Sequence, residues 1–166
     1  MKKLSLLLLP MCLSFVLSSC SKKSTPSPSI TGTITVTIDG SAQTFNVSAA
    51  ARIQNISGVN VLNIFGTQST GSTNSIAMSV VNSSITAGTY TGVGSQAQIS
   101  YALASGTVYQ YADDDAAAYA TIVIKSISST NIQGTFSGNL NLIGGTGAAT
   151  ETLTNGTFNL NIVTTD

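Results

Sequence analysis

The sequence predicts an all-β protein, an antiparallel β-sandwich of about eight to ten strands, with an open β-barrel as the alternative. Apolar and polar residues alternate along many short segments, which is the pattern of strands wetted on one face. An Asp-Gly pair directly follows the first such segment, and clusters of turn-forming residues recur between the later ones. Beyond the N-terminal leader, no long stretch has the apolar spacing of a helix.

The first hairpin is the clearest local prediction. Isoleucine and valine alternate with threonine along residues 30–38, and Asp39-Gly40 follows. This dipeptide is the strongest short signal for a two-residue hairpin turn. Such a turn would pair Ile34 with Phe45 and place both on the core face, so the turn and the hydrophobic pattern agree.

Further strands are expected where apolar residues share one face. Residues 61–65 are apolar on both faces, which predicts a central strand. Turn-rich stretches at residues 69–75, 82–87, 128–131 and 144–148 separate the expected strands. The other expected strands are marked by Ile76, Met78 and Val80; by Ile99, Tyr101 and Leu103; by residues 118–124; by Phe136, Leu140 and Leu142; and by Phe158, Leu160 and Ile162.

Residues 1–19 have the features of a bacterial lipoprotein signal peptide. Two lysines precede an apolar segment, residues 4–17, which is shorter than the roughly 20 residues that a membrane-spanning helix needs. Leu-Ser-Ser-Cys at residues 17–20 resembles the lipobox of bacterial lipoproteins. This resemblance implies diacylglyceryl transfer to the Cys20 sulfur, cleavage before Cys20 and acylation of the new N-terminus. We therefore expect acylated Cys20 to anchor the protein to membrane lipid.

Residues 20–29 are expected to form the lipidated cysteine and a Ser/Pro tether. In extended form, residues 21–29 would span roughly 28 Å at about 3.1 Å per residue. Ser21 stands where some bacteria place the aspartate that retains lipoproteins in the inner membrane, so resemblance favours the outer membrane. Lys22 and Lys23 stand where some bacteria carry acidic signals for surface export, so the periplasmic face is favoured over surface exposure.

Residues 30–166 are expected to form a single β-sandwich domain. Only 7% of all residues are charged, and cleavage before Cys20 would leave four basic residues against six acidic ones. No basic face is expected, which makes nucleic acid an improbable partner. Cys12 lies in the leader and Cys20 would be acylated, so the domain would have no thiol for a disulfide.

A Gly-Thr-aromatic motif occurs three times, beginning at Gly88, Gly134 and, more weakly, Asn155-Gly156. We expect the glycine to allow a tight turn, the threonine to face outward and the aromatic residue to anchor the next strand in the core. Together with the lipobox and the first hairpin, these motifs resemble small Bacteroidota lipoproteins that have no assigned activity. The resemblance implies a β-sandwich and export, and it supplies no catalytic residues.

Catalysis is not expected. Residues 20–166 contain no histidine, and their one cysteine would be acylated, which excludes the usual catalytic triads and zinc sites. A carboxylate-dependent hydrolase would need Glu151 beside one of the residues Asp113–Asp115, and nothing in the sequence brings them together. No enzyme, cofactor or metal is therefore predicted.

The best candidate ligand site is formed by Tyr109, Tyr111 and the acidic run Asp113, Asp114 and Asp115. Two tyrosines two residues apart share a face of a strand and could stack on sugar rings or anchor a partner protein. The alternative is that both belong to the core or to a sheet edge. The acidic run is expected to be a solvated loop, with calcium binding as a second possibility.

These observations lead to one expected function and two rivals. The expected function is a lipid-anchored, non-catalytic binding or envelope-associated module, with a glycan or an envelope protein as partner. One rival is a structural or protein-interaction lipoprotein that has no small ligand. The other rival is the carboxylate-dependent hydrolase.

Overall fold

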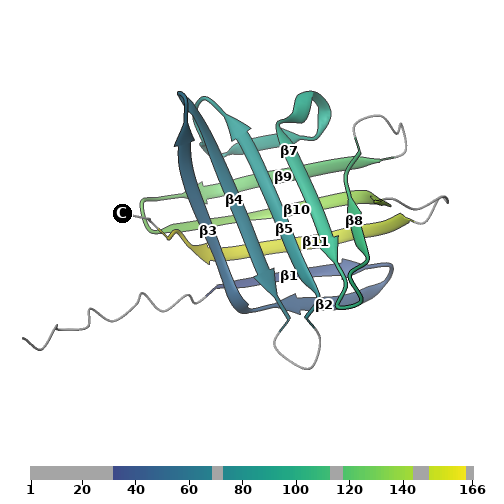
Figure 1. Ribbon diagram of the computed structural model, residues 1–166. Helices are drawn as coiled ribbons and strands as arrows, with labels where there is room; N and C mark the ends of the chain where they lie inside the picture. Colours follow the sequence, from purple (N-terminus) through teal and green to yellow (C-terminus); the bar gives the residue numbers. More distant parts are fainter. Residues whose placement is uncertain (1–31, 69–72, 113–117, 144–149, 164–166) are drawn as a thin grey trace, which may run out of the picture.

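The computed structural model of the chain describes residues 32–68, 73–112, 118–143 and 150–163 (Figure 1). Within these ranges the chain forms eleven strands and one 3-10 turn, η1 (Val93–Ser95), so the predicted all-β class is confirmed. The strands are β1 (Thr33–Ile38), β2 (Ser41–Phe45), β3 (Val47–Ile56), β4 (Val59–Thr67), β5 (Ser75–Asn82), β6 (Gly88–Thr91), β7 (Ala97–Ala102), β8 (Val108–Gln110), β9 (Tyr119–Ile127), β10 (Asn131–Leu142) and β11 (Thr150–Asn161).

The strand count exceeds the expected eight to ten mainly because the sequence analysis missed β3. This strand contains three successive alanines, Ala49, Ala50 and Ala51, all of which are fully buried. Small residues on both faces hide the alternation that marks a strand, so periodicity alone does not find it.

All strands belong to one antiparallel sheet that curves into an almost closed barrel. The hydrogen-bonded order is β2-β1-β11-β10-β8-β7-β5-β4-β3, and β9 pairs with both β10 and β6. In Figure 1, β3, β4, β5 and β7 form a front layer whose strands cross the back layer of β1, β9, β10 and β11 at a steep angle. This arrangement is the open-barrel form of the predicted architecture.

Two features turn the sheet around its corners. β10 pairs with β9 along most of its length and with β8 only through Asn141 and Leu142, so one long strand belongs to both layers. On the other side, the end of β11 approaches β3 through a parallel bridge between Ala51 and Ile162. The Val163 amide donates a hydrogen bond to the Ala51 carbonyl over 2.8 Å. This bridge nearly completes the circle.

The first hairpin has the predicted register. Ile34 lies opposite Phe45, and both side chains are fully buried. Asp39 and Gly40 have φ angles of +44° and +81°. These left-handed values define the turn that Asp-Gly favours, because its twist matches that of the flanking strands.

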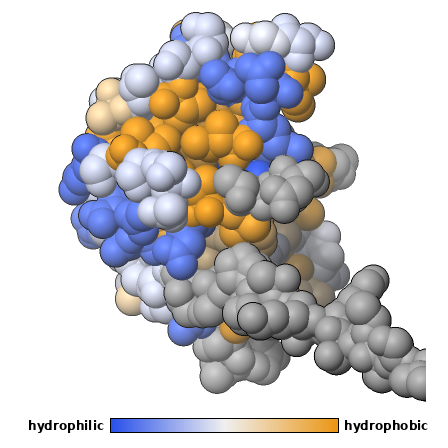
Figure 2. Space-filling model, turned by 90° about the vertical axis from the view of Figure 1, so that its left-hand side faces the viewer, coloured by the Kyte–Doolittle hydropathy of each residue, from blue (hydrophilic) through white to orange (hydrophobic). Residues whose placement is uncertain are grey.

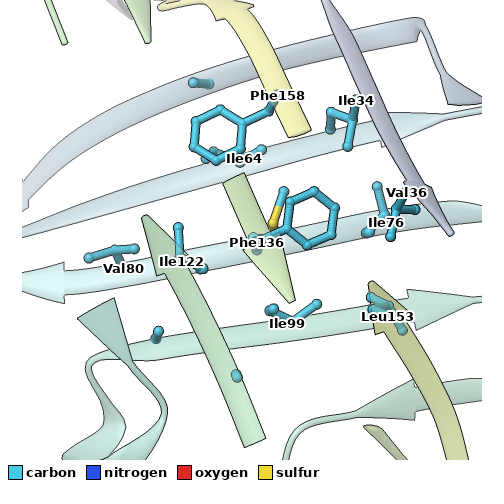
Figure 3. Packing of buried hydrophobic residues seen from close by; sticks show 14 of the residues in the cluster. Ile34, Val36, Ile64, Ile76, Val80, Ile99, Ile122, Phe136, Leu153 and Phe158 are labelled. Carbon is cyan, nitrogen blue, oxygen red and sulfur yellow. The ribbon is translucent and has the colours of Figure 1, made fainter. Parts of the chain in front are cut away.

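The core fills the space between the two layers. Figure 3 shows Phe136 and Phe158 of the back layer pointing toward Ile64 and Ile76 of the front layer. None of the fully buried side chains in the described ranges is charged, and none belongs to a polar residue type. Stability therefore depends on apolar packing and on the sheet hydrogen bonds.

The Gly-Thr-aromatic motif has a different structural role from the predicted one. The copies in β10 and β11 pair with each other, so that Gly134 lies opposite Phe158 and Phe136 lies opposite Gly156. A Cβ atom on Gly134 would stand 2.4 Å from Cζ of Phe158, and one on Gly156 would stand 2.7 Å from Cδ1 of Phe136. Each ring thus covers the glycine of the opposite strand, and we call this arrangement the reciprocal lock.

The prediction that these glycines make tight turns is therefore wrong, because Gly134 and Gly156 lie inside strands. Only the first copy begins a strand, with Gly88 as the first residue of β6. The outward direction of the threonines is confirmed by Thr135 and Thr157, which pair across β10 and β11 on the outer face.

β4 is an interior strand of the sheet, but only one of its faces is covered. Leu62 and Ile64 point into the core and are at most 1% exposed. On the opposite face Phe65 is 40% exposed. The prediction of a strand with neighbours on both sides is confirmed, whereas the expected burial of both faces is wrong. The outer face of the front layer therefore presents apolar side chains to solvent.

Candidate functional site

The tyrosines of the predicted ligand corner point into the barrel. Tyr109 of β8 lies opposite Tyr101 of β7, is half-buried and packs against the core. Tyr111 is only 7% exposed. Its ring fills the space beside Gly92, where a Cβ atom would stand 2.4 Å from the ring. The two tyrosines share a face, but it is the inner one, so neither presents an open ring to a sugar.

The other predicted site residues are Cys20, Asp113, Asp114 and Asp115, and they lie outside the described residues. The calcium hypothesis for the acidic run lies there as well. Among the residues that the structure describes, no group of three or more acidic side chains converges as a metal site would require.

A pair of carboxyl groups that the sequence analysis did not anticipate lies where the β1–β2 turn meets the start of β11. The Thr152 amide donates to Asp39 Oδ1 over 2.8 Å, and the Asp39 amide donates to the Thr152 carbonyl over 3.0 Å. Glu151, the preceding residue, forms a side-chain hydrogen bond with Asp39. Burial, and then the nearby Asp39 carboxylate, raise the pKa of Glu151 above its usual value.

Asp39 and its hydrogen bonds with Thr152 hold the β1–β2 turn against the start of β11. Glu151 is in hydrogen-bond contact with Asp39, whereas the two carboxyl groups of a glycoside hydrolase are held apart with the sugar or a water between them. Next to this pair, burial and then Glu151 raise the pKa of the Tyr101 phenol. The Asn74 side-chain amide donates to the Tyr101 hydroxyl over 3.1 Å. The pair therefore gives the hydrolase hypothesis no support.

The outer face of the front layer has a shallow hollow of about 250 Å³, which we call the amide groove. Two cross-strand rows of side chains border it. In one row, Asn63, Ser79 and Gln98 lie opposite one another on β4, β5 and β7. In the other row, Phe65, Ala77, Ser100 and Gln110 lie opposite one another on β4, β5, β7 and β8.

The chemistry of the amide groove is neutral. Its outward side chains carry three carboxamides and two hydroxyls, and none of them carries a charge. Within the described parts of the chain, no hydrogen bond occupies these five side chains. Each carboxamide offers both a donor and an acceptor, and Phe65 adds a partly exposed ring at one end of the rows. This combination suits a ligand that has many hydroxyl groups and an apolar face.

The sequence gives only a weak signal for the amide groove. Its residues come from four strands and lie up to 47 positions apart, between Asn63 and Gln110. What the sequence does show is that outward positions hold Asn, Gln and Ser where soluble proteins more often carry Lys and Glu. Only the pairing of β4, β5, β7 and β8 gathers them into two rows.

A second hollow, of about 400 Å³, lies on the outer face of β9, β10 and β11. Four of its eight lining residues carry a hydroxyl group, and it sits at the bulge where Asn155 has a φ angle of +53°. Beside this hollow the Thr157 and Thr35 hydroxyls hydrogen-bond to each other over 2.8 Å. The residues that line this hollow include no exposed aromatic side chain, since Phe136 is buried, so it is the weaker candidate for a ligand.

Comparison of the chain with protein-family models, with curated proteins and with solved structures found no match. Within the described residues, no helix has the length and apolar character needed to cross a membrane. The site must therefore be interpreted from its own geometry and chemistry.

Proposed function

We propose that the protein is a lipid-anchored, non-catalytic module of the cell envelope that binds a neutral saccharide in the amide groove. The observation that carries this proposal is the uncharged lining itself. Carboxamides and hydroxyls match the hydroxyl groups of a sugar, and an exposed aromatic ring matches the apolar C–H face of a sugar ring. A charged ligand would find no counter-ion in this lining.

The absence of acid and base groups from the groove lining supports binding rather than turnover. None of its side chains is a carboxylate, a lysine or a histidine, so nothing there can transfer a proton to a leaving group. The groove is also open and shallow, which suits an extended glycan surface better than an enclosed reactive centre.

Calorimetric titration of the mature protein with a panel of neutral oligosaccharides tests this proposal. Phe65→Ala should weaken binding about tenfold, because it removes the one stacking ring. Tyr119→Ala is the matched control, since Tyr119 is an exposed aromatic residue on β9 in the other layer. Failure of every neutral oligosaccharide to bind, or equal losses in both variants, would reject the amide groove as a saccharide site.

The envelope placement rests on the lipobox resemblance, with acylated Cys20 in the outer membrane and the domain on its periplasmic side. Mass spectrometry of the N-terminal fragment should find a diacylglyceryl group on Cys20. A Cys20→Ser variant should carry no such group and should keep its leader, residues 1–19, uncleaved. An unmodified residue 20 in the native protein would remove the anchor from the proposal.

A protein partner is the second candidate, and the free edge of β3 favours it. Beyond Ala51 the described residues provide β3 with no strand neighbour on the side opposite β4. An open strand edge presents backbone donors and acceptors to which another chain can add a strand. Crosslinking in intact envelopes from a residue beside this edge should capture one dominant protein if this function holds.

A further inference from the structure

Large exposed aliphatic side chains gather at one end of the barrel, which we call the apolar end. Ile56 and Val59 flank the β3–β4 turn and are 57% and 39% exposed. Val81 lies near the end of β5, where its amide donates to the Gln96 carbonyl just after η1. Val93 in η1 is 76% exposed. In Figure 1 the β3–β4 turn, the end of β5 and η1 all lie at the top of the molecule.

The rim of the apolar end is polar but uncharged. Residues 54–61, 80–87 and 92–97 contain no acidic or basic residue. The Asn55 side-chain amide donates to Asn60 Oδ1 over 3.0 Å, and the Asn60 side-chain amide donates to the Ser83 carbonyl over 2.8 Å. On the side of the molecule shown in Figure 2, apolar residues gather across the middle, and polar residues border them above and below. Because no ion has to be desolvated, such a surface can enter a lipid interface at low cost.

The apolar end continues directly into the amide groove. Val61 and Val81 lie opposite each other on the outer face of β4 and β5. Two residues further along these strands, on the same face, the pair Asn63 and Ser79 begins the groove. This step is about 7 Å along a strand. A molecule that has an apolar part and a sugar part would therefore meet matching surfaces in the right order.

The tether can bring the apolar end to the membrane. Gly32, the first described residue, lies against β3, since a Cβ atom on it would stand 2.8 Å from the Ala49 carbonyl oxygen. From Ala49 to Ile56 the strand covers seven steps, roughly 23 Å. The extended tether of residues 21–29 spans roughly 28 Å. A lipid at Cys20 therefore leaves enough chain for the far end of β3 to rest on the same membrane.

We infer that the apolar end is a lipid-contacting surface, and that the amide groove binds the saccharide head group of a neutral glycolipid in the membrane that carries the anchor. This inference rests on the proposed saccharide site and the proposed anchor, and it names the ligand more narrowly. The acyl chains of the glycolipid stay in the bilayer while its sugar reaches the groove beside the Val61 and Val81 pair. Among the described residues neither surface carries a charged side chain, which favours a neutral head group as the ligand.

Fluorescence on vesicles tests the contact. A polarity-sensitive dye is placed on Ser84→Cys, near the apolar end, or on Ser105→Cys, in the β7–β8 turn at the other end, because the acylated protein has no competing thiol. The acylated protein is then inserted into phosphatidylcholine vesicles. The Ser84 label should shift to a less polar environment and the Ser105 label should not. Equal shifts, or no shift while the protein stays vesicle-bound, would overturn the lipid-contacting surface and leave the anchor intact.

Glycolipid binding is measured with a Cys20→Ser protein produced without residues 1–19, so that neither the lipid anchor nor the apolar leader can contribute. Adding a galactosyl diacylglycerol to the phosphatidylcholine vesicles should raise binding about tenfold. Phe65→Ala and Val93→Asn should each abolish this gain, and circular dichroism should show both variants folded. If a free neutral oligosaccharide binds while the glycolipid adds nothing, the inference fails and the saccharide site stands. If neither binds, both fail. A dimer that forms through the apolar end in sedimentation experiments would also overturn the inference.

Discussion

The strand pairs β10–β11 and β3–β4 distribute their bulky side chains in opposite ways. In β10–β11 the aromatic rings of Phe136 and Phe158 point inward over glycines, and the outer face carries threonine and asparagine. In β3–β4 the inward side of β3 carries alanine, while Ile56 and Phe65 face solvent. The two pairs share one sheet and one antiparallel geometry.

The opposite directions of the bulky side chains imply different roles for the two strand pairs. We assign stability to β10–β11 and recognition to β3–β4. Side chains that interlock between layers cannot change without disturbing the core, because interiors are packed at crystal-like density. Side chains on the outer face of β4 have no such constraint, and exposed apolar groups there contribute little to stability and mark a surface that can bind a partner or ligand. We therefore expect changes in β10–β11 to alter the free energy of unfolding and changes in β3–β4 to alter binding.

The largest expected effect is that of Gly134→Ala. Its new Cβ would stand 2.1 Å from the Val123 carbonyl oxygen and 2.4 Å from the Phe158 ring, so the backbone of β9 or β10 must shift. Overpacking of this kind costs about 1–3 kcal/mol. Phe65→Ala should change the free energy of unfolding by less than about 0.5 kcal/mol. Urea titration of both variants checks the contrast, and similar losses in the two would contradict it.

A smaller effect is expected in how the free energy of unfolding depends on pH, through Glu151 at the start of β11. The pKa of Glu151 is raised by burial and by Asp39, so folding favours its protonated form. The contribution of protonated Glu151 to the free energy of unfolding is fully present below pH 4.5, its ordinary pKa. It is lost as the pH rises through the raised pKa of the folded protein. Glu151→Gln, which stays neutral, should flatten the decline in stability across that window. Thermal melts from acid to neutral pH measure it, and parallel curves for both proteins would show that Glu151 does not cause the decline.

The smallest expected effect lies in the β3–β4 turn. Ser57 and Gly58 both have left-handed φ angles, +53° and +87°. Asparagine adopts this conformation more readily than serine, so Ser57→Asn should stabilise the protein by about 0.5 kcal/mol. The corresponding turn at Asp39-Gly40 already has a favourable residue, so Asp39→Asn should not stabilise it and should weaken the hydrogen bond from Thr152. A loss of stability in Ser57→Asn would contradict the turn assignment.

The strand positions and the first hairpin could be predicted because they depend on local pattern. Alternation placed Ile34, Ile76 and Phe158 in the core, and the Asp-Gly turn fixed the register of β1 against β2. The Gly-Thr-aromatic motif was recognised but assigned to turns. Its partner is another copy of itself 22 residues away, and no local rule pairs Gly134 with Phe158.

The candidate site could not be predicted in the same way. The ligand hypothesis required Tyr109 and Tyr111 to be exposed, with positions in the core or at a sheet edge as the alternative, and spacing alone cannot decide which face of a strand turns inward. The curvature of β10 and the glycine at position 92 placed Tyr111 in the core. The candidate ligand contacts are instead residues such as Asn63 and Gln98, which are ordinary polar residues along the chain. They form a site only because strand pairing makes them neighbours.

The alternation of apolar and polar residues is enough to predict strands around an apolar core, because no other regular structure buries side chains that repeat with a period of two. The sequence also predicts that the outer surfaces are neutral, because so few residues are charged. Which neutral side chains lie together, and which apolar ones stay exposed, depends on how the strands pair and how the sheet curves. Strand order and sheet curvature arise from contacts between segments far apart in the chain, and no local preference encodes them.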